Sequence, residues 1–198
     1  MKLSVVIPAY NEAESITETI TVLYDKLNQE QIEHEIVVVN DNSNDTTLEV
    51  LNELSTRIGT LVIFTNSSGR NGYGYAVRLG LENFSGDCVA VMMADLSDSP
   101  DDLVLFYKKM LEGYDCVFGS RWIKGGKVYD YPKVKLMMNR LFNTMVRMAF
   151  RLKYNDLTNA FKLYSRETIE GIKPFLSPHF NLTLELPLKS IVRGYSYA

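Results

Sequence analysis

Residues 4–40 decide the fold class, because they read as a strand, a helix and a second strand: SVVIPAYNEAESITETITVLYDKLNQEQIEHEIVVVN. The apolar runs SVVIPAY and EIVVVN have the continuous Val and Ile content of strands that are buried on both faces. Between them, EAESITETITVLYDKLNQE has the spacing of an amphipathic helix. This order is typical of strands that lie parallel in a sheet covered by helices.

The alternation of apolar strands and amphipathic helices continues to about residue 120. Further strands are expected at 60–65, 87–93 and 115–120, and helices at 45–58, 74–84 and 100–113. We therefore predict an α/β fold in which helices cover both faces of an open, mostly parallel sheet. After Gly126 the alternation stops, and we expect a long helix, a strand and a last helix at 132–153, 159–165 and 179–194.

Length and composition limit the class of protein. The chain has 198 residues, of which 46% are apolar, so we expect one core and a single domain over residues 1–198. Its last residues, GYSYA, read as a strand that is just beginning, so we expect a C-terminal part to be missing. The net charge of -3 gives no support for a nucleic-acid partner.

Cysteine usage and hydropathy predict the location. Cys88 and Cys116 lie in apolar runs and read as buried thiols of a reducing compartment. His34 and His179 are far apart in the sequence and predict no zinc cluster. The N-terminus lacks the features of a secretory leader, and no run approaches the roughly twenty apolar residues needed to cross a bilayer. We therefore expect a cytoplasmic protein without a membrane span.

Polar residues gather where the expected strands end. In open α/β sheets ligands bind outside the carboxyl ends of the strands. Turn formation explains any one such cluster, but several on one edge of a sheet predict a binding site. The clusters are PAYNE at 8–12, NDNSND at 40–45, NSSGRNGYG at 66–74, ADLSD at 94–98 and GSRWIKGG at 119–126.

The fourth cluster is strongly acidic, since residues 89–103 read VAVMMADLSDSPDDL. One interpretation is a turn and a helix start, because Asp and Ser suit N-caps and Pro100 suits a first helical turn. The alternative is a divalent cation, Mg²⁺ or Mn²⁺, held by Asp95 and Asp98, because hard cations prefer oxygen ligands.

The other clusters supply groups that a nucleotide diphosphate needs. The ring of Tyr10 suits stacking on a base, and the carboxylates of Glu12 and Asp41 suit hydrogen bonds to a nucleoside. The loop with Arg70 and Gly72 leads into a helix, which would bring backbone N–H groups and a cation toward phosphate. Arg121 adds a planar cation for an anionic oxygen.

Six blocks in order resemble the family 2 glycosyltransferases with the GT-A fold, and among them the branch of dolichyl-phosphate mannosyltransferase and related polyprenyl-phosphate sugar transferases. The blocks cover nearly the whole chain: VVIPAYNE, VVVNDNSNDTT, NGYGYAVRLGL, ADLSDSPDDL, GSRWIKGG and DLTNAFKLYS. The resemblance implies an inverting transfer of a sugar from a nucleotide-diphosphate donor, helped by a divalent metal. It also implies a polyprenyl phosphate acceptor and a peripheral position at the cytoplasmic face of a membrane.

The resemblance also assigns roles on the donor side. Pro8, Tyr10 and Glu12 match nucleotide contacts, and Asp41 matches the acidic contact to base or ribose. Asp95 matches the second acid of the metal motif.

Two departures from the family pattern lie on this side. The first acid of the metal motif is replaced by Met93, a poor ligand for a hard cation, so Asp98 is the candidate for the missing ligand. Asn40 stands where an acid usually precedes Asp41.

On the acceptor side, Arg121 matches an arginine that meets phosphate, and Lys133 or Lys135 matches the cations that follow the GG pair. A lipid phosphate is already an anion, so it needs charge neutralisation more than a general base. Two alternatives stay open. One is a family 2 enzyme that acts on a hydroxyl in polysaccharide or glycolipid synthesis, and the other is a nucleotide-binding module without turnover, as Met93 would favour.

The expected helix at 132–153 contains no acid and has an apolar stripe. The stripe consists of Val134, Met138, Leu141, Met145, Met148 and Leu152. Beside it runs a basic band of Lys133, Arg140, Arg147 and Arg151. The stripe predicts a face packed on the core, with a solvated charged side. The alternative is a surface that meets anionic lipid headgroups.

Overall fold

The computed structural model describes residues 1–123 and 132–198. Its strands form one sheet in the order β3-β2-β1-β4-β6-β5. Their bounds are β1 (Leu3–Ala9), β2 (His34–Asn40), β3 (Leu61–Thr65), β4 (Cys88–Val91), β5 (Cys116–Phe118) and β6 (Lys162–Ser165). β1 to β4 pair in parallel, whereas β6 is antiparallel to both β4 and β5. The sheet is therefore mostly parallel, as predicted, and β5 runs in the same direction as β1 to β4.

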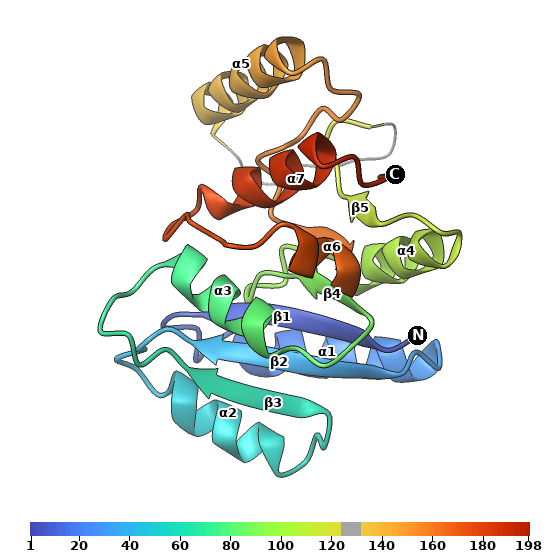
Figure 1. The fold of residues 1–198 in the computed structure, drawn as a ribbon. Helices are drawn as coiled ribbons and strands as arrows, with labels where there is room; N and C mark the ends of the chain where they lie inside the picture. The colour runs from blue at the N-terminus through green and yellow to red at the C-terminus, as the bar shows by residue number, and fades with distance from the viewer. Residues whose placement is uncertain (124–131) are drawn as a thin grey trace.

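Helices cover both faces of this sheet (Figure 1). One core cluster is covered by α1 (Ile16–Gln29), α2 (Thr47–Ser55) and α4 (Pro100–Leu111). The other is covered by α3 (Tyr73–Asn83), α6 (Arg166–Gly171) and α7 (Leu182–Val192). The predicted α/β class is confirmed. Among the helices of the described residues, α6 alone was not expected, because six residues are too few to show a helical period.

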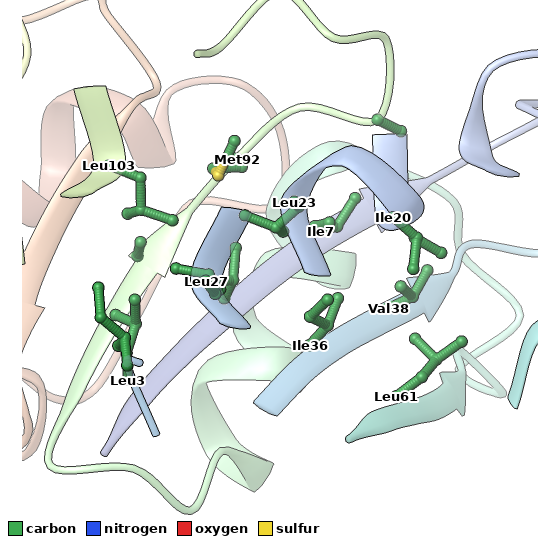
Figure 2. Packing of buried hydrophobic residues seen from close by; sticks show 14 of the residues in the cluster. Leu3, Ile7, Ile20, Leu23, Leu27, Ile36, Val38, Leu61, Met92 and Leu103 are labelled. Carbon is green, nitrogen blue, oxygen red and sulfur yellow. The ribbon is translucent and has the colours of Figure 1, made fainter. Parts of the chain in front are cut away.

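The first of these clusters shows how the apolar spacing of α1 becomes packing. Ile20, Leu23 and Leu27 are fully buried, and they face Ile7 and Ile36 of the sheet (Figure 2). Burial of one such side chain contributes about 1.5–3 kcal/mol to stability. The expected buried thiols are also present, since Cys88 and Cys116 are both buried and reduced.

The long helix α5 (Lys133–Ala149) corrects one prediction. Of the apolar stripe expected to face the core, only Leu152, beyond the end of the helix, is buried, whereas Val134 is 72% and Met148 is 74% exposed. The inward face carries Asn143, which is buried, and Val146, which packs on the second cluster. On this face Asn143 Nδ2 donates to Thr158 Oγ1, and the helix itself lies at the top of Figure 1, away from the sheet.

The directions of the strands bring the polar segments to one edge. β1, β2, β4 and β5 end at this edge, and β6 begins there because it runs the opposite way. β4 and β2 lie on opposite sides of β1, so the strand order reverses at β1. Ligands of open α/β sheets bind at such a reversal. We call this edge the carboxyl edge.

The last residues extend the sheet on the far side of β5. Ala198 N donates to Cys116 O at 3.1 Å, and Cys116 N donates to Ser196 O at 3.0 Å. The expected strand character of GYSYA is therefore confirmed as a parallel bridge. Across the described residues, no helix combines the length and the hydropathy needed to cross a membrane.

Candidate functional site

At the end of β2, Asp41 holds the loop predicted to bind phosphate. Its carboxylate is buried and accepts hydrogen bonds from Asn66 Nδ2 and from Gly72 N, both at 2.6 Å. These bonds fix residues 66–72 against the strand end. Asp41 is therefore an anchor of this loop, and its contact to a nucleoside stays a prediction.

The same loop is confined from the other side by residues 177–179. A Cβ atom at Gly72 would lie 2.7 Å from His179 Nδ1, and one at Gly74 would lie 2.4 Å from Ser177 O. Glycine is required at both positions by this close approach. Arg70 is exposed on the loop, with Nη1 3.5 Å from the hydroxyl of Tyr75.

The end of β1 places the predicted nucleoside contacts. Pro8 lies in β1 opposite Val39 of β2. Tyr10 is 47% exposed, so its ring is open to stacking by a ligand. Glu12 is partly buried, and its Oε2 accepts from Ser15 Oγ at 2.7 Å before α1 begins. Glu12 thus also has a local structural role.

After β4 the two candidate metal ligands lie in one short turn. Asp98 Oδ2 accepts from Met93 N at 2.9 Å, and Asp95 Oδ1 accepts from Ser97 N at 3.0 Å. Asp95 is exposed and Asp98 is partly buried. Burial, helped by the negative charge of Asp95, raises the pKa of Asp98 to about 6, against the lowering effects of the Met93 N–H and of the cations Lys162 and Arg121.

Arg121 lies just beyond the end of β5 and is held by a carboxylate that precedes β6. Its Nε and Nη2 donate to the two oxygens of Asp156 at 2.8 and 2.7 Å, and its backbone N donates to the same group at 3.0 Å. Asp156 is fully buried, while the Arg121 side chain is 24% exposed. A bidentate pair of this kind fixes the plane of the guanidinium.

Lys162, a buried lysine near this pair, was missed by sequence reasoning. Lys162 is 1% exposed, and its Nζ donates to the backbone oxygens of Leu157, Asn159 and Thr183. Burial lowers the pKa of Lys162 to about 7, against the opposing effect of Asp156. The group pins the segment that carries Asp156 and so helps to place Arg121.

Sequence reasoning also missed Asp156, although the block DLTNAFKLYS was one of the blocks that carried the resemblance. An acid directly before an apolar strand, and a lysine inside that strand, were the signals that could have found both residues.

The two candidate acceptor cations lie in the first turn of α5. Lys133 is the first residue of the helix, and Lys135 is exposed in its first turn. Further along, Asn143 Nδ2 donates to Thr158 Oγ1 at 3.0 Å, and Arg121 Nη2 donates to the same hydroxyl at 3.1 Å. One hydroxyl thus links α5 to Arg121.

The donor set at the carboxyl edge fits Mg²⁺ or Mn²⁺ held partly by a ligand. In residues 1–123 and 132–198, no three His, Cys, Asp or Glu side chains are grouped as a metal site. Mg²⁺ is usually bound by one or two carboxylates together with substrate phosphates, and Asp95 and Asp98 supply that number. The negative charge of Asp95 contributes to the raised pKa of Asp98. A cation bound between the two carboxylates would offset their repulsion.

Comparison with known proteins identifies the family. Residues 4–172 match the model of Glycosyl transferase family 2. The chain belongs to this family. The family 2 chain is 33% identical over 193 residues to the dolichol-phosphate mannosyltransferase of Pyrococcus furiosus, which covers 96% of this chain and 53% of that protein. It is 29% identical over 173 residues to the uncharacterized glycosyltransferase YkcC of Bacillus subtilis, covering 87% of this chain and 52% of that one. The family 2 chain thus spans about half the length of these relatives.

Solved structures show the same fold. A crystal structure of glucosyl-3-phosphoglycerate synthase from Mycobacterium tuberculosis, with Mn²⁺, UDP and phosphoglyceric acid, superposes with a TM-score of 0.75 at 20% identity. The superposed part covers 100% of the family 2 chain and 67% of the chain of the synthase. Another structure of that enzyme contains Mg²⁺ and UDP, with a TM-score of 0.72. The predicted GT-A fold is confirmed.

Proposed function

We propose that this family 2 chain transfers a sugar, with inversion, from a nucleotide-diphosphate sugar to a polyprenyl phosphate. The observation that carries the proposal is the meeting, at the carboxyl edge, of two carboxylates with a rigidly held guanidinium. Asp98 is close enough to Arg121 for the guanidinium to lower its pKa. The identity to a dolichol-phosphate mannosyltransferase supports the choice of acceptor.

The donor is placed by the segments between β1 and α3. Tyr10 stacks on the base, Glu12 and Asp41 hydrogen-bond the nucleoside, and Pro8 shapes the floor beneath it. The backbone of the loop with Arg70 and Gly72 faces the diphosphate. A divalent ion held by Asp95 and Asp98 would neutralise charge on the leaving diphosphate.

The transfer needs one bond made and one broken. An oxygen of the acceptor phosphate attacks the anomeric carbon from the side opposite the diphosphate, and the bond from that carbon to the diphosphate breaks with its electron pair on the leaving oxygen. No general base is required, because the attacking oxygen already carries negative charge at neutral pH. Arg121, with Lys133 or Lys135, offsets the repulsion between the two anions. Asp156 and Lys162 keep Arg121 in place.

The acceptor also places the protein at a membrane surface. The exposed apolar face of α5, next to arginines and free of acids, is typical of a helix that lies in the interface of an anionic bilayer. We propose a peripheral position at the cytoplasmic face.

The test is transfer with labelled nucleotide sugars of different base and sugar, each offered polyprenyl phosphate, a sugar hydroxyl or phosphoglycerate in the presence of Mn²⁺. Labelled lipid phosphate is expected, and Asp95→Asn should abolish it while the matched exposed change Asp102→Asn should not. Product on a hydroxyl or on phosphoglycerate alone would overturn the acceptor. Tight nucleotide binding with no product and no metal dependence would instead favour a binding module, as Met93 would allow.

A further inference from the structure

A second polar pocket lies on the side of α5, separate from the donor site. It has a volume of about 190 Å³ and is lined by Trp122, Arg140, Thr144, Arg147 and Asn155. This is below the roughly 300–1,000 Å³ of typical small-molecule pockets, so it fits a phosphate-sized group better than a nucleotide. No acid lines it.

The cations of this pocket have no carboxylate partner among the residues that the structure describes. The guanidinium of Arg140 lies 4.6 Å from the centre of the Trp122 ring. Arg147 donates only through Nε, to Leu152 O at 3.3 Å. The Nε1 group of Trp122 is buried and has no acceptor within the described part of the chain. The described lining of the pocket therefore offers hydrogen-bond donors and positive charge, and no carboxylate.

The pocket lies where a polar stripe of α5 meets an apolar stripe of the same helix. Arg140, Thr144 and Arg147 follow the i, i+4, i+7 spacing of one stripe, and Leu141, Met145 and Met148 follow it one residue later. The second stripe is exposed. A ligand held by the arginines thus has an apolar surface directly beside it, as a phospholipid requires for its headgroup and its chains.

We propose that this pocket binds the phosphate of an anionic phospholipid of the bilayer, a lipid other than the acceptor. The proposal rests on the membrane position proposed above. Arg140 and Arg147 neutralise the phosphate, and the amide of Asn155, which also lines the pocket, donates to one of its oxygens. Leu141, Met145 and Met148 lie against the first carbons of the acyl chains. Binding there holds α5, and with it Thr158 and Arg121, at a fixed depth.

The test uses vesicle co-sedimentation and the emission of Trp122, the only tryptophan of the chain. Phosphatidylglycerol vesicles should bind and shift the emission, and phosphatidylcholine vesicles should bind at least about 10-fold more weakly, given the attraction of basic groups to anionic lipid. The double variant R140Q/R147Q should lose about 10-fold in co-sedimentation. R151Q/K153Q, which removes two exposed charges outside the pocket, should stay within about 3-fold of the original protein.

Equal losses in the two double variants would overturn the pocket in favour of unspecific attraction. Saturation of the emission change by millimolar inorganic phosphate, with loss of vesicle binding, would assign the pocket to a soluble phosphate and overturn the lipid. Transfer to polyprenyl phosphate in detergent, where no bilayer exists, separates this proposal from the proposed function. R140Q/R147Q should keep the transfer in detergent. If the unmodified protein binds vesicles but makes no product in detergent, the result counts against the proposed acceptor and leaves the lipid pocket standing.

Discussion

The two edges of the sheet use buried acids in opposite ways. At the amino edge, Glu35 accepts from Ser4 Oγ at 2.6 Å, from Ser85 N and Oγ at 2.5 Å, and from Lys2 Nζ at 3.2 Å. These donors hold the pKa of Glu35 at about 2, although burial alone would raise it. At the carboxyl edge, Asp98 accepts from one backbone N–H, and burial raises its pKa to about 6.

This difference separates a structural acid from a binding acid. A carboxylate whose oxygens are saturated by the protein stabilises the fold and has nothing left for a ligand. One that is desolvated and under-bonded makes the empty protein less stable and is improved by a cation. Perturbed acids of the second kind gather at functional sites.

The largest effect expected is on stability, from Glu35→Gln. At pH 7 the change should lower the free energy of unfolding by about 3 kcal/mol, because a folded-state pKa near 2 against 4.5 unfolded corresponds to roughly that amount. The stabilisation is fully present above about pH 4.5 and is lost as the pH falls toward 2. Urea denaturation of both proteins across this range measures it. Glu33→Gln, an exposed neighbour, is the control, and a loss that does not depend on pH would break the comparison.

The second effect is on the reaction, from Asp98→Asn at the other edge. Loss of one of two carboxylate ligands should weaken Mn²⁺ binding and lower the transfer rate about 100-fold, or about 2.7 kcal/mol. Calorimetric titration of Mn²⁺ with a nucleotide diphosphate measures the first and the transfer assay the second. Asp102→Asn should change neither. Unaltered Mn²⁺ affinity in Asp98→Asn would remove this residue from the site.

The third effect is a gain of stability from the same Asp98→Asn change. Since the folded pKa of about 6 lies above the usual 3.8, the original protein loses stability as the pH rises from about 4 to 6, and the variant should not. After allowance for the partial exposure of Asp98, the variant should be about 1 kcal/mol more stable at pH 7.5 without metal. Thermal unfolding with a chelator present measures this. A loss of stability would place Asp98 with Glu35 as a structural acid.

The smallest effect is expected on the exposed apolar face of α5. Met145→Ala on the exposed face of α5 should change the free energy of unfolding by less than about 0.5 kcal/mol in solution, as is usual for surface positions. Leu23→Ala in α1 should cost about 2–5 kcal/mol. Urea denaturation of the two variants side by side tests the contrast. A large loss in Met145→Ala would mean that this face is covered in solution.

These two helices also show what could be read from the sequence. The apolar spacing of α1 predicted its buried face correctly, with Ile20 and Leu23 fully enclosed. The same kind of spacing in α5 identified an apolar face and left two interpretations open: the one in which this face packs on the core is wrong, and the one in which it meets lipid stays a prediction. Periodicity tells which side of a helix is apolar, and only the fold tells what lies against it.

The site was predictable to the extent that strand ends converge. Asp41, Asp98 and Arg121 follow strands that run in the same direction, so their common edge followed from the α/β pattern. The partners of Arg121 were not predictable in this way, because Asp156 precedes a strand. It reaches the same edge only because β6 is antiparallel, and apolar content alone carries no sign of strand direction.

The antiparallel course of β6 has a further consequence for how this chain can change. β5 ends at Phe118 and β6 begins at Lys162, and the Arg121–Asp156 pair joins the chain just after the first strand to the chain just before the second. Asn143, Leu152 and Tyr154 of this segment are buried, so we expect changes at its exposed positions to disturb the sheet less than changes at these three. Under the proposed function, the acceptor side can therefore vary through the exposed residues of this segment, while the proposed donor side between β1 and α3 is kept.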